Sequence, residues 1–108
     1  MNTVQKQLRI VQRAVDRNQK LPTTEHVAQD CNVNVVKAKA IIRRYMIYQY
    51  IKRYSTENQF PPSRREISKT LHIPLTSVQH HINQLTLAGE ISVSPGRSRT
   101  IRLLEKSA

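Results

Sequence analysis

Residues 61–104 carry the pattern that most constrains the fold, because they predict two short helices joined by a tight turn and followed by a hairpin. Pro61-Pro62 interrupts any preceding helix. Ser63, with Glu66 three residues later, predicts a capping box at the start of the first helix. Its apolar positions run into the turn at Ile67, Leu71 and Ile73.

A second helix is predicted after Pro74, over about residues 76–87, with Thr76 as its capping residue. Its inward face has helical spacing and consists of Val78, Ile82 and Leu85. Gly89 should end it. Such a helix has one apolar face for the core and one polar face for solvent or a ligand.

The segment EISVSPGRSRTIRLL alternates apolar and polar residues around a Ser-Pro-Gly-Arg turn, which predicts a β-hairpin at about residues 91–103. Helix, turn, helix and basic hairpin in this order are typical of a winged helix-turn-helix, which places one helix in the major groove of DNA. The pattern therefore indicates a DNA-binding regulator.

The charge of the chain favours the same partner. The sequence has 18 Lys and Arg against 7 Asp and Glu, a net charge of +11, which favours nucleic acid first and an anionic membrane second. No apolar run approaches the roughly 20 residues that span a bilayer, and the N-terminus lacks the apolar core of a signal peptide. We expect a cytoplasmic protein that binds double-stranded DNA and no membrane.

The first part of the chain repeats the second at an offset of forty residues, so that RNQKLPT at 17–23 aligns with ENQFPPS at 57–63. The aligned pairs keep apolar or small character: Val27 with Ile67, Ala28 with Ser68, Cys31 with Leu71, Val33 with Ile73, Ala38 with Val78, and Ile42 with Ile82. We therefore predict a mainly α protein with one β-hairpin. It would be built as tandem helix-turn-helix units over residues 1–45 and 46–108, the second winged.

Three helices are expected in the first unit. The first covers residues 3–17, with an apolar face of Val4, Leu8, Val11 and Val15. Thr23 or Thr24 should start the second, Cys31-Asn32-Val33 is the turn, and the third starts near Asn34. No Gly or Pro stands between Val33 and Phe60. A single helix over about residues 35–54 and a bend near Met46 both fit this segment.

The polar face of the predicted helix at 76–87 holds the candidate base-reading residues Thr76, Ser77, Gln79, His80 and Asn83. Gln and Asn can bond adenine N6 and N7 together, and Ser or Thr can bond several base edges. Candidate phosphate ligands are Arg64, Arg65, Lys69, Arg97 and Arg99. The alternatives are an ordinary polar surface and a solvated charged loop.

The equivalent face of the first unit is more basic and poorer in base-reading side chains, with Val36, Lys37, Lys39, Ala40 and Arg43. A second DNA-binding surface is therefore a candidate, made of Asn34, Lys37, Lys39 and Arg43. Contact with a second copy of the chain or with a protein partner is the alternative for this unit.

No pattern indicates a metal, a cofactor or an active site. The four histidines and Cys31 lack the spacing of a ligand set, and the two glycines form no phosphate-binding loop. Since no nucleophile–base pair stands out, we expect a protein that is not an enzyme.

Residues 44–104 resemble the DNA-binding domain of the LexA repressor family, the regulators of the bacterial SOS response. The resemblance is carried by YIKRYSTENQFPPSRREISKTLHIP, HHINQLTLAGEI and SRTIRLL, in family order and spacing. It implies a winged helix-turn-helix whose recognition helix reads an operator at the positions matching Thr76, Ser77, Gln79 and His80.

The chain also departs from that family. The turn is shorter than in many members, and Gln79-His80 stands where an acidic pair is common, so the operator should differ. We expect no self-cleaving peptidase domain, and therefore neither autoproteolysis nor the dimer contact that this domain supplies.

These observations together predict a sequence-specific transcriptional regulator, a repressor in the first place, of the kind found in a phage or mobile element. A plasmid or phage replication or partition protein is the first alternative. An adaptor that binds and antagonises another regulator is the second.

Overall fold

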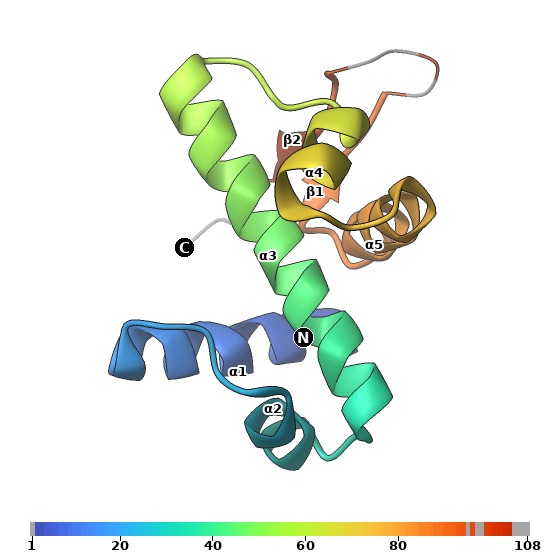
Figure 1. The fold of residues 1–108 in the computed structure, drawn as a ribbon. Coiled ribbons are helices and arrows are strands. Elements are labelled where there is room, and N and C mark those ends of the chain that lie inside the picture. The colour runs from blue at the N-terminus through green and yellow to red at the C-terminus, as the bar shows by residue number, and fades with distance from the viewer. Residues whose placement is uncertain (1, 95, 97–98, 105–108) are drawn as a thin grey trace. The chain divides into compact units, whose positions relative to one another are not determined.

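The computed structural model describes residues 2–94, 96 and 99–104. The elements along the chain are α1 (Thr3–Asn18), α2 (Thr24–Cys31), α3 (Val35–Asn58), α4 (Arg64–Leu71), α5 (Leu75–Leu87), β1 (Ile91–Ser92) and β2 (Arg102–Leu103) (Figure 1). The predicted fold class is confirmed, since the chain is mainly helical and its small antiparallel hairpin follows a helix-turn-helix. Within the described ranges, no helix is both long enough and apolar enough to cross a bilayer.

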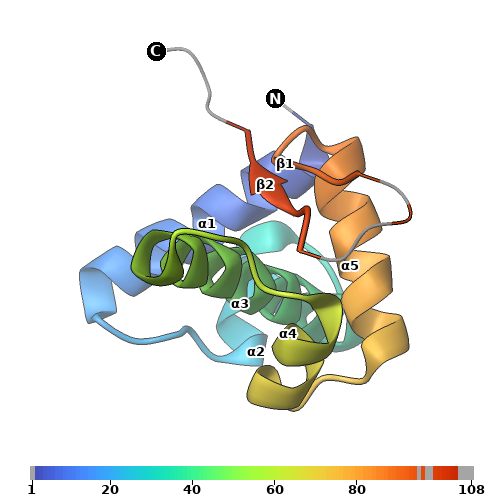
Figure 2. The ribbon, with the colours of Figure 1, turned by 90° about the horizontal axis from the view of Figure 1, so that it is seen from above.

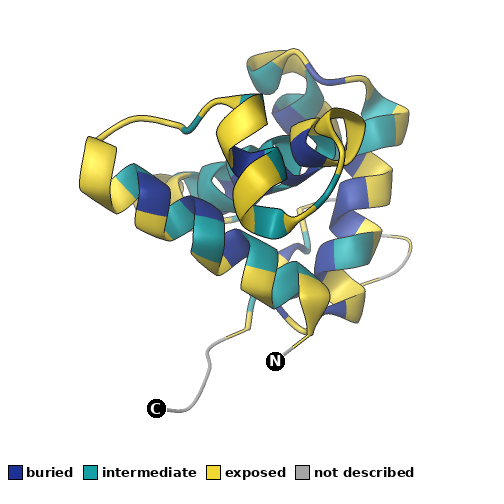
Figure 3. Cartoon of the chain, turned by 90° about the horizontal axis from the view of Figure 1, so that it is seen from below, coloured by how far each residue is buried: buried dark blue, intermediate teal, exposed yellow. Residues whose placement is uncertain are grey.

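The chain divides into two compact units, Met1–Tyr45 (unit 1) and Met46–Ala108 (unit 2). Unit 2 has an aliphatic core to which α3, α4, α5 and the hairpin segment contribute. The most deeply buried side chains are Ile47 and Ile51 of α3, Ile67 of α4, Val78, Ile82 and Leu85 of α5, and Ile91 and Ile101 of the hairpin. Figure 3 shows this burial on the helices, where buried residues in dark blue stand among exposed residues in yellow.

The wing of unit 2 is a short hairpin that packs beside α5 (Figure 2). Its ladder has two residue pairs, with Ile91 opposite Leu103. Beyond the ladder, the Ser94 amide donates to the Thr100 hydroxyl at 3.1 Å, and that hydroxyl donates back to the Ser94 carbonyl at the same distance. Both strands lie within the predicted range 91–103, and the two bonds of the Thr100 hydroxyl extend the contact beyond the two residue pairs. The predicted Ser-Pro-Gly-Arg turn lies partly outside the described residues.

Unit 1 has a smaller core. Its buried side chains are Leu8, Val11 and Ala14 of α1, Val27 of α2, and Ala38, Ile41 and Tyr45 of α3. The predicted face of α1 was partly wrong, because Val4 and Val15 are only half-buried and Ala14 is buried instead. The Tyr45 hydroxyl donates to Oε1 of Gln12 at 2.9 Å and so links α3 to α1.

The two units share one helix-turn-helix framework. The bounds of α4 are those of α2 shifted by forty residues, and α5 starts forty residues after α3. Asn32 and His72 end α2 and α4 in the left-handed conformation, each with φ of 56°. The turn then closes through equivalent bonds, Val33 N–H to the Ala28 carbonyl at 3.0 Å and Ile73 N–H to the Ser68 carbonyl at 3.1 Å.

The helix starts follow from local capping, with two corrections. Thr23 and Ser63 cap α2 and α4 by accepting the N–H of the third residue after them. The Glu66 carboxylate, however, accepts from the Ser63 hydroxyl and not from its backbone. Thr76 is not a cap, because α5 begins at Leu75 and Pro74 occupies the cap position without a side-chain bond. Proline fits there since its missing N–H would lack a helical partner.

α3 is one continuous helix from Val35 to Asn58 and runs through Met46. Asn34 starts it by accepting the Lys37 N–H on Oδ1 at 2.8 Å. The helix runs four residues beyond the predicted end and is followed by Gln59, which is left-handed with φ of 68°.

Candidate nucleic-acid interface

The two faces of α5 separate the core residues from the candidate base-reading residues. Val78, His81, Ile82 and Leu85 are buried. Thr76, Gln79, His80 and Asn83 are exposed, and Ser77 is half-buried. The helix therefore presents all five candidates on or beside its outer face, and none of them is buried in the core.

The α4–α5 turn holds this outer face in place. The Ser68 hydroxyl donates to the Ile73 carbonyl at 2.6 Å, in addition to the backbone bond in the opposite direction. Ile73 itself is buried in the turn. A reading helix needs such support, because its contacts to bases depend on placement to within a fraction of an ångström.

Basic side chains lie on the helix that precedes α5. Arg65 and Lys69 of α4 are exposed and Arg64 is half-buried. Arg97, also predicted to bind phosphate, lies outside the described residues. The arrangement on α4 is suitable for phosphate contacts on the flank of a groove.

Arg99 has several partners in unit 2 that were not foreseen. Its Nη1 donates to the Tyr54 hydroxyl and to the Pro61 carbonyl, both at 3.3 Å, and its Nη2 donates to the Glu66 carboxylate. The guanidinium carbon lies 5.2 Å from the centre of the Phe60 ring. Arg99 therefore ties the wing to the end of α3 and the start of α4. The sequence signal for this role was weak, since its partners lie 33 to 45 residues away.

The same cluster acts on the Glu66 carboxyl. A hydrogen bond from Tyr54 is the largest cause that lowers the pKa of Glu66, and the Arg99 charge and the bond from Ser63 act in the same direction. Burial opposes them. Glu66 therefore stays ionised at neutral pH, which retains its attraction for Arg99.

Glu90 is a buried acid that sequence reasoning missed. Its side chain is 3% exposed, at the junction between α5 and β1. Burial, followed by the charge of Glu90 and a hydrogen bond with it, raises the pKa of Tyr48 to about 12. The Glu90 backbone bonds Leu85 and Leu104 at 3.0 Å each, so this residue joins the end of α5 to the hairpin.

In unit 1 the candidate second surface lies on the first half of α3. Lys37 and Lys39 are exposed, and Arg43 is half-buried. Asn34 is exposed as well, but its side chain already caps the helix. Val36, between them, is 79% exposed.

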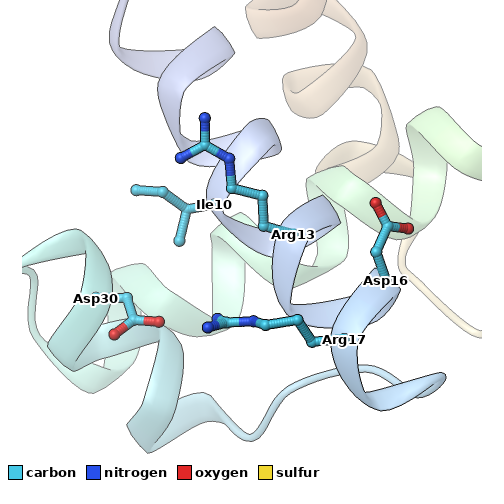
Figure 4. A pocket seen from close by; sticks show the side chains of 5 residues that line it. All are labelled: Ile10, Arg13, Asp16, Arg17 and Asp30. Atoms are coloured by element: carbon cyan, nitrogen blue, oxygen red, sulfur yellow. The ribbon is translucent and has the colours of Figure 1, made fainter.

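An open groove lies between α1 and α2 of unit 1, with a volume of about 540 Å³ (Figure 4). Its lining side chains are Ile10, Arg13, Asp16, Arg17 and Asp30. Arg17 extends from α1 toward Asp30 of α2 (Figure 4), and Asp30 also pairs with His26 at 3.0 Å. The lining is charged with both signs and mostly exposed, unlike the apolar, enclosed pocket of a small-molecule site.

Metal binding and thiol chemistry are two further possibilities for the residues that the structure describes. No three His, Cys, Asp or Glu side chains gather there in a way that could hold a metal ion. Cys31 is half-buried, and burial, then the charge of Asp30, raises the pKa of its thiol. A raised pKa leaves little thiolate at neutral pH, so this thiol is a poor nucleophile.

The sequence is similar to that of LexA repressors from several bacteria. It is 37% identical to the LexA repressor of Cellvibrio japonicus over 67 residues, which are 61% of this chain and 34% of that protein. It is 39% identical to the LexA repressor of Clostridium tetani over 62 residues, which are 56% of this chain and 31% of that protein. It is 33% identical to the LexA repressor of Haemophilus influenzae over 67 residues, which are 61% of this chain and 32% of that protein. The chain thus spans about a third of the length of these relatives.

The family model for the LexA DNA binding domain matches residues 39–100. This match takes in α3 from Lys39 onward, α4, α5 and β1, and so includes the outer face of α5 and the turn that supports it. It covers more than half of the chain. The chain belongs to the LexA DNA binding domain family.

Proposed function

We propose that unit 2 binds duplex DNA sequence-specifically and that the chain acts as a transcriptional repressor. The observation that carries the proposal is the exposed polar face of α5, supported by a fixed turn and a wing, in a member of this family. The relatives that the chain resembles are named LexA repressors, and this name describes proteins about three times as long as the matched segment.

The α5 helix would lie in the major groove and read bases with its outer face. Gln79 and Asn83 are four residues apart and lie one above the other on the helix. Each can form two hydrogen bonds to an adenine, and a contact of this kind discriminates by about 1–3 kcal/mol. Thr76, Ser77 and His80 would complete the contacts to neighbouring bases.

Basic residues on α4 and in the wing would hold the phosphates on either side. Arg64, Arg65 and Lys69 are suited to this role on α4, and Arg97 in the wing. Arg99 would serve first as the residue that positions the wing. A guanidinium has five N–H donors, so its described bonds are compatible with a phosphate contact as well.

Fluorescence anisotropy with duplex DNA tests the proposal, first on fragments selected from random sequence. If about six phosphates are neutralised, affinity should fall roughly a thousandfold between about 50 and 200 mM salt. An adaptor that binds only proteins would show no duplex binding even at low salt, and this result would contradict the proposal.

Gln79→Ala tests base reading by α5. It should weaken binding to the selected site by about 1–3 kcal/mol and leave binding to random duplex unchanged. Thr86→Ala is the control, because Thr86 is exposed at the far end of α5 and its hydroxyl bonds Ile82 of the same helix. Equal losses on selected and random DNA for Gln79→Ala would show that Gln79 reads no base.

A further inference from the structure

The first half of α3 has an exposed face that unit 1 does not use for its core. Val36 is 79% exposed, although it is apolar and lies in the first turn of the helix. The opposite side of the same segment is buried through Ala38, Ile41 and Tyr45. The outer face consists of Val36, Lys37, Lys39, Ala40 and Arg43, here called the α3 face.

The α3 face is equivalent to the reading face of α5. At the offset of forty residues, the pairs are Val36 with Thr76, Lys37 with Ser77, Lys39 with Gln79, Ala40 with His80, and Arg43 with Asn83. The buried positions correspond in the same way: Ala38 with Val78, Ile41 with His81, and Tyr45 with Leu85. The turns before the two helices close through equivalent bonds. Relative to the helix that precedes each of them, α3 and α5 therefore have their outer faces at equivalent positions.

The charge of unit 1 is complementary to nucleic acid. Residues 1–45 hold nine Lys and Arg against three Asp and Glu, a net charge of +6. The α3 face has three cations and no carboxylate, because the acidic residues of the unit lie on α1 and α2. Lys37 stands in the first turn of α3, where the helix dipole disfavours a cation.

We propose that unit 1 is a second DNA-binding module, which contacts duplex DNA through the α3 face and reads a different subsite from unit 2. The proposal rests on the proposed function of unit 2. Lys39 and Arg43 would bond guanine O6 and N7 or a phosphate, and Val36 and Ala40 would pack on thymine methyl groups. The amides of Gln79 and Asn83 on α5 stand where α3 carries cations, and Thr76 and His80 stand where α3 carries Val36 and Ala40. One chain would therefore recognise two unlike subsites.

Charge reversal in the full-length chain tests the proposal. The variant is Lys37→Glu with Lys39→Glu, and the matched control is Lys6→Glu with Arg9→Glu, two exposed cations on α1. Both variants change the net charge by the same amount, so their difference reports position and not overall charge. Lys37→Glu should not harm α3, since a Glu three residues after the Asn34 cap completes a capping box. Circular dichroism verifies that both variants keep their helix content.

We expect the α3-face variant to bind its selected duplex at least about tenfold more weakly than the control, and its salt slope to fall by about 2. Selection from random duplex should yield a motif with two unlike parts for the wild type. The α3-face variant should lose one part and keep the other, and Gln79→Ala should relax the part that the α3-face variant keeps. Uracil in place of a thymine read by Val36 removes one methyl group and should weaken binding about fourfold.

Three results would overturn the proposal while leaving unit 2 as a DNA binder. In the first, the α3-face variant and the control weaken duplex binding equally. In the second, the wild type selects a motif with one part. In the third, it selects a motif with two identical halves, which two unlike faces of one chain cannot produce. Absence of duplex binding by the wild type would instead remove the proposed function of unit 2 as well.

Discussion

Ile67→Ala should remove about a third or more of the stability of unit 2. Ile67 is fully buried on α4, against which α5 packs. The substitution deletes three carbons, which costs about 2.4 kcal/mol at ~0.8 kcal/mol for each. The cavity left behind brings the total toward the 2–5 kcal/mol typical of such changes, or about 3 kcal/mol.

This loss is large for so small a unit. Unit 2 has 63 residues, and a domain of that size has a total stability of about 3–9 kcal/mol. At about 4–8 °C for each kcal/mol, the melting transition of unit 2 should move down by roughly 12–24 °C. Duplex binding at a fixed temperature should fall with the folded fraction, because α5 is no longer supported by α4.

Thermal unfolding followed by circular dichroism, together with anisotropy on a duplex probe, checks this expectation. Leu87→Ala is the control, since Leu87 of α5 is 81% exposed and its loss should change stability by no more than about 0.5 kcal/mol. If Ile67→Ala and Leu87→Ala have the same melting temperature, then Ile67 is not a core residue and the packing of α4 on α5 described above is wrong.

Three further predictions concern single positions. The pKa of Tyr48 is raised from 10 to about 12, so the stabilisation from neutral Tyr48 is complete below pH 10 and is lost as the pH rises through about 12. Tyrosinate absorbance should show one late-ionising tyrosine that disappears in Tyr48→Phe. In Glu90→Gln the pKa of Tyr48 should fall only part of the way back toward its ordinary value, because burial is the largest cause of the rise. His72 has φ of 56°, so His72→Val should cost about 1–2 kcal/mol, while His72→Asn, which copies Asn32, should be nearly neutral in urea unfolding. Arg97→Ala should weaken binding to all duplexes alike and lower the salt slope by about 1; loss confined to the selected site would contradict a phosphate role.

Features that depend on neighbours within one or two helical turns were predictable. Thr23 and Ser63 cap their helices as expected, because a cap needs only the N–H groups of the next three residues. Asn32 takes the left-handed conformation in the predicted turn. Apolar spacing identified Val78, Ile82 and Leu85 as the core face of α5, and by elimination the outer face that holds the candidate base-reading residues.

Features that depend on distant partners were missed. Nothing near Glu90 in the sequence indicates that a carboxyl would be buried, because its partner Tyr48 is distant in the chain. Arg99 was expected to face phosphate alone, yet it bonds Tyr54, Pro61 and Glu66. His81 was considered only as a metal ligand and is in fact 4% exposed on the core face of α5.

The sequence by itself determined the helix-turn-helix order, the wing and the repeat, since local capping, turn conformation and apolar periodicity are properties of short segments. It also showed which face of α5 turns inward. Only the tertiary structure decided which residues meet across elements, such as Arg99 with Glu66 and Tyr48 with Glu90. It also showed that α3 is continuous from Val35 to Asn58. Burial of Ile41 and Tyr45 in unit 1 and of Ile47 and Ile51 in unit 2 stabilises both halves of this helix, and such packing cannot be seen in a segment of sequence.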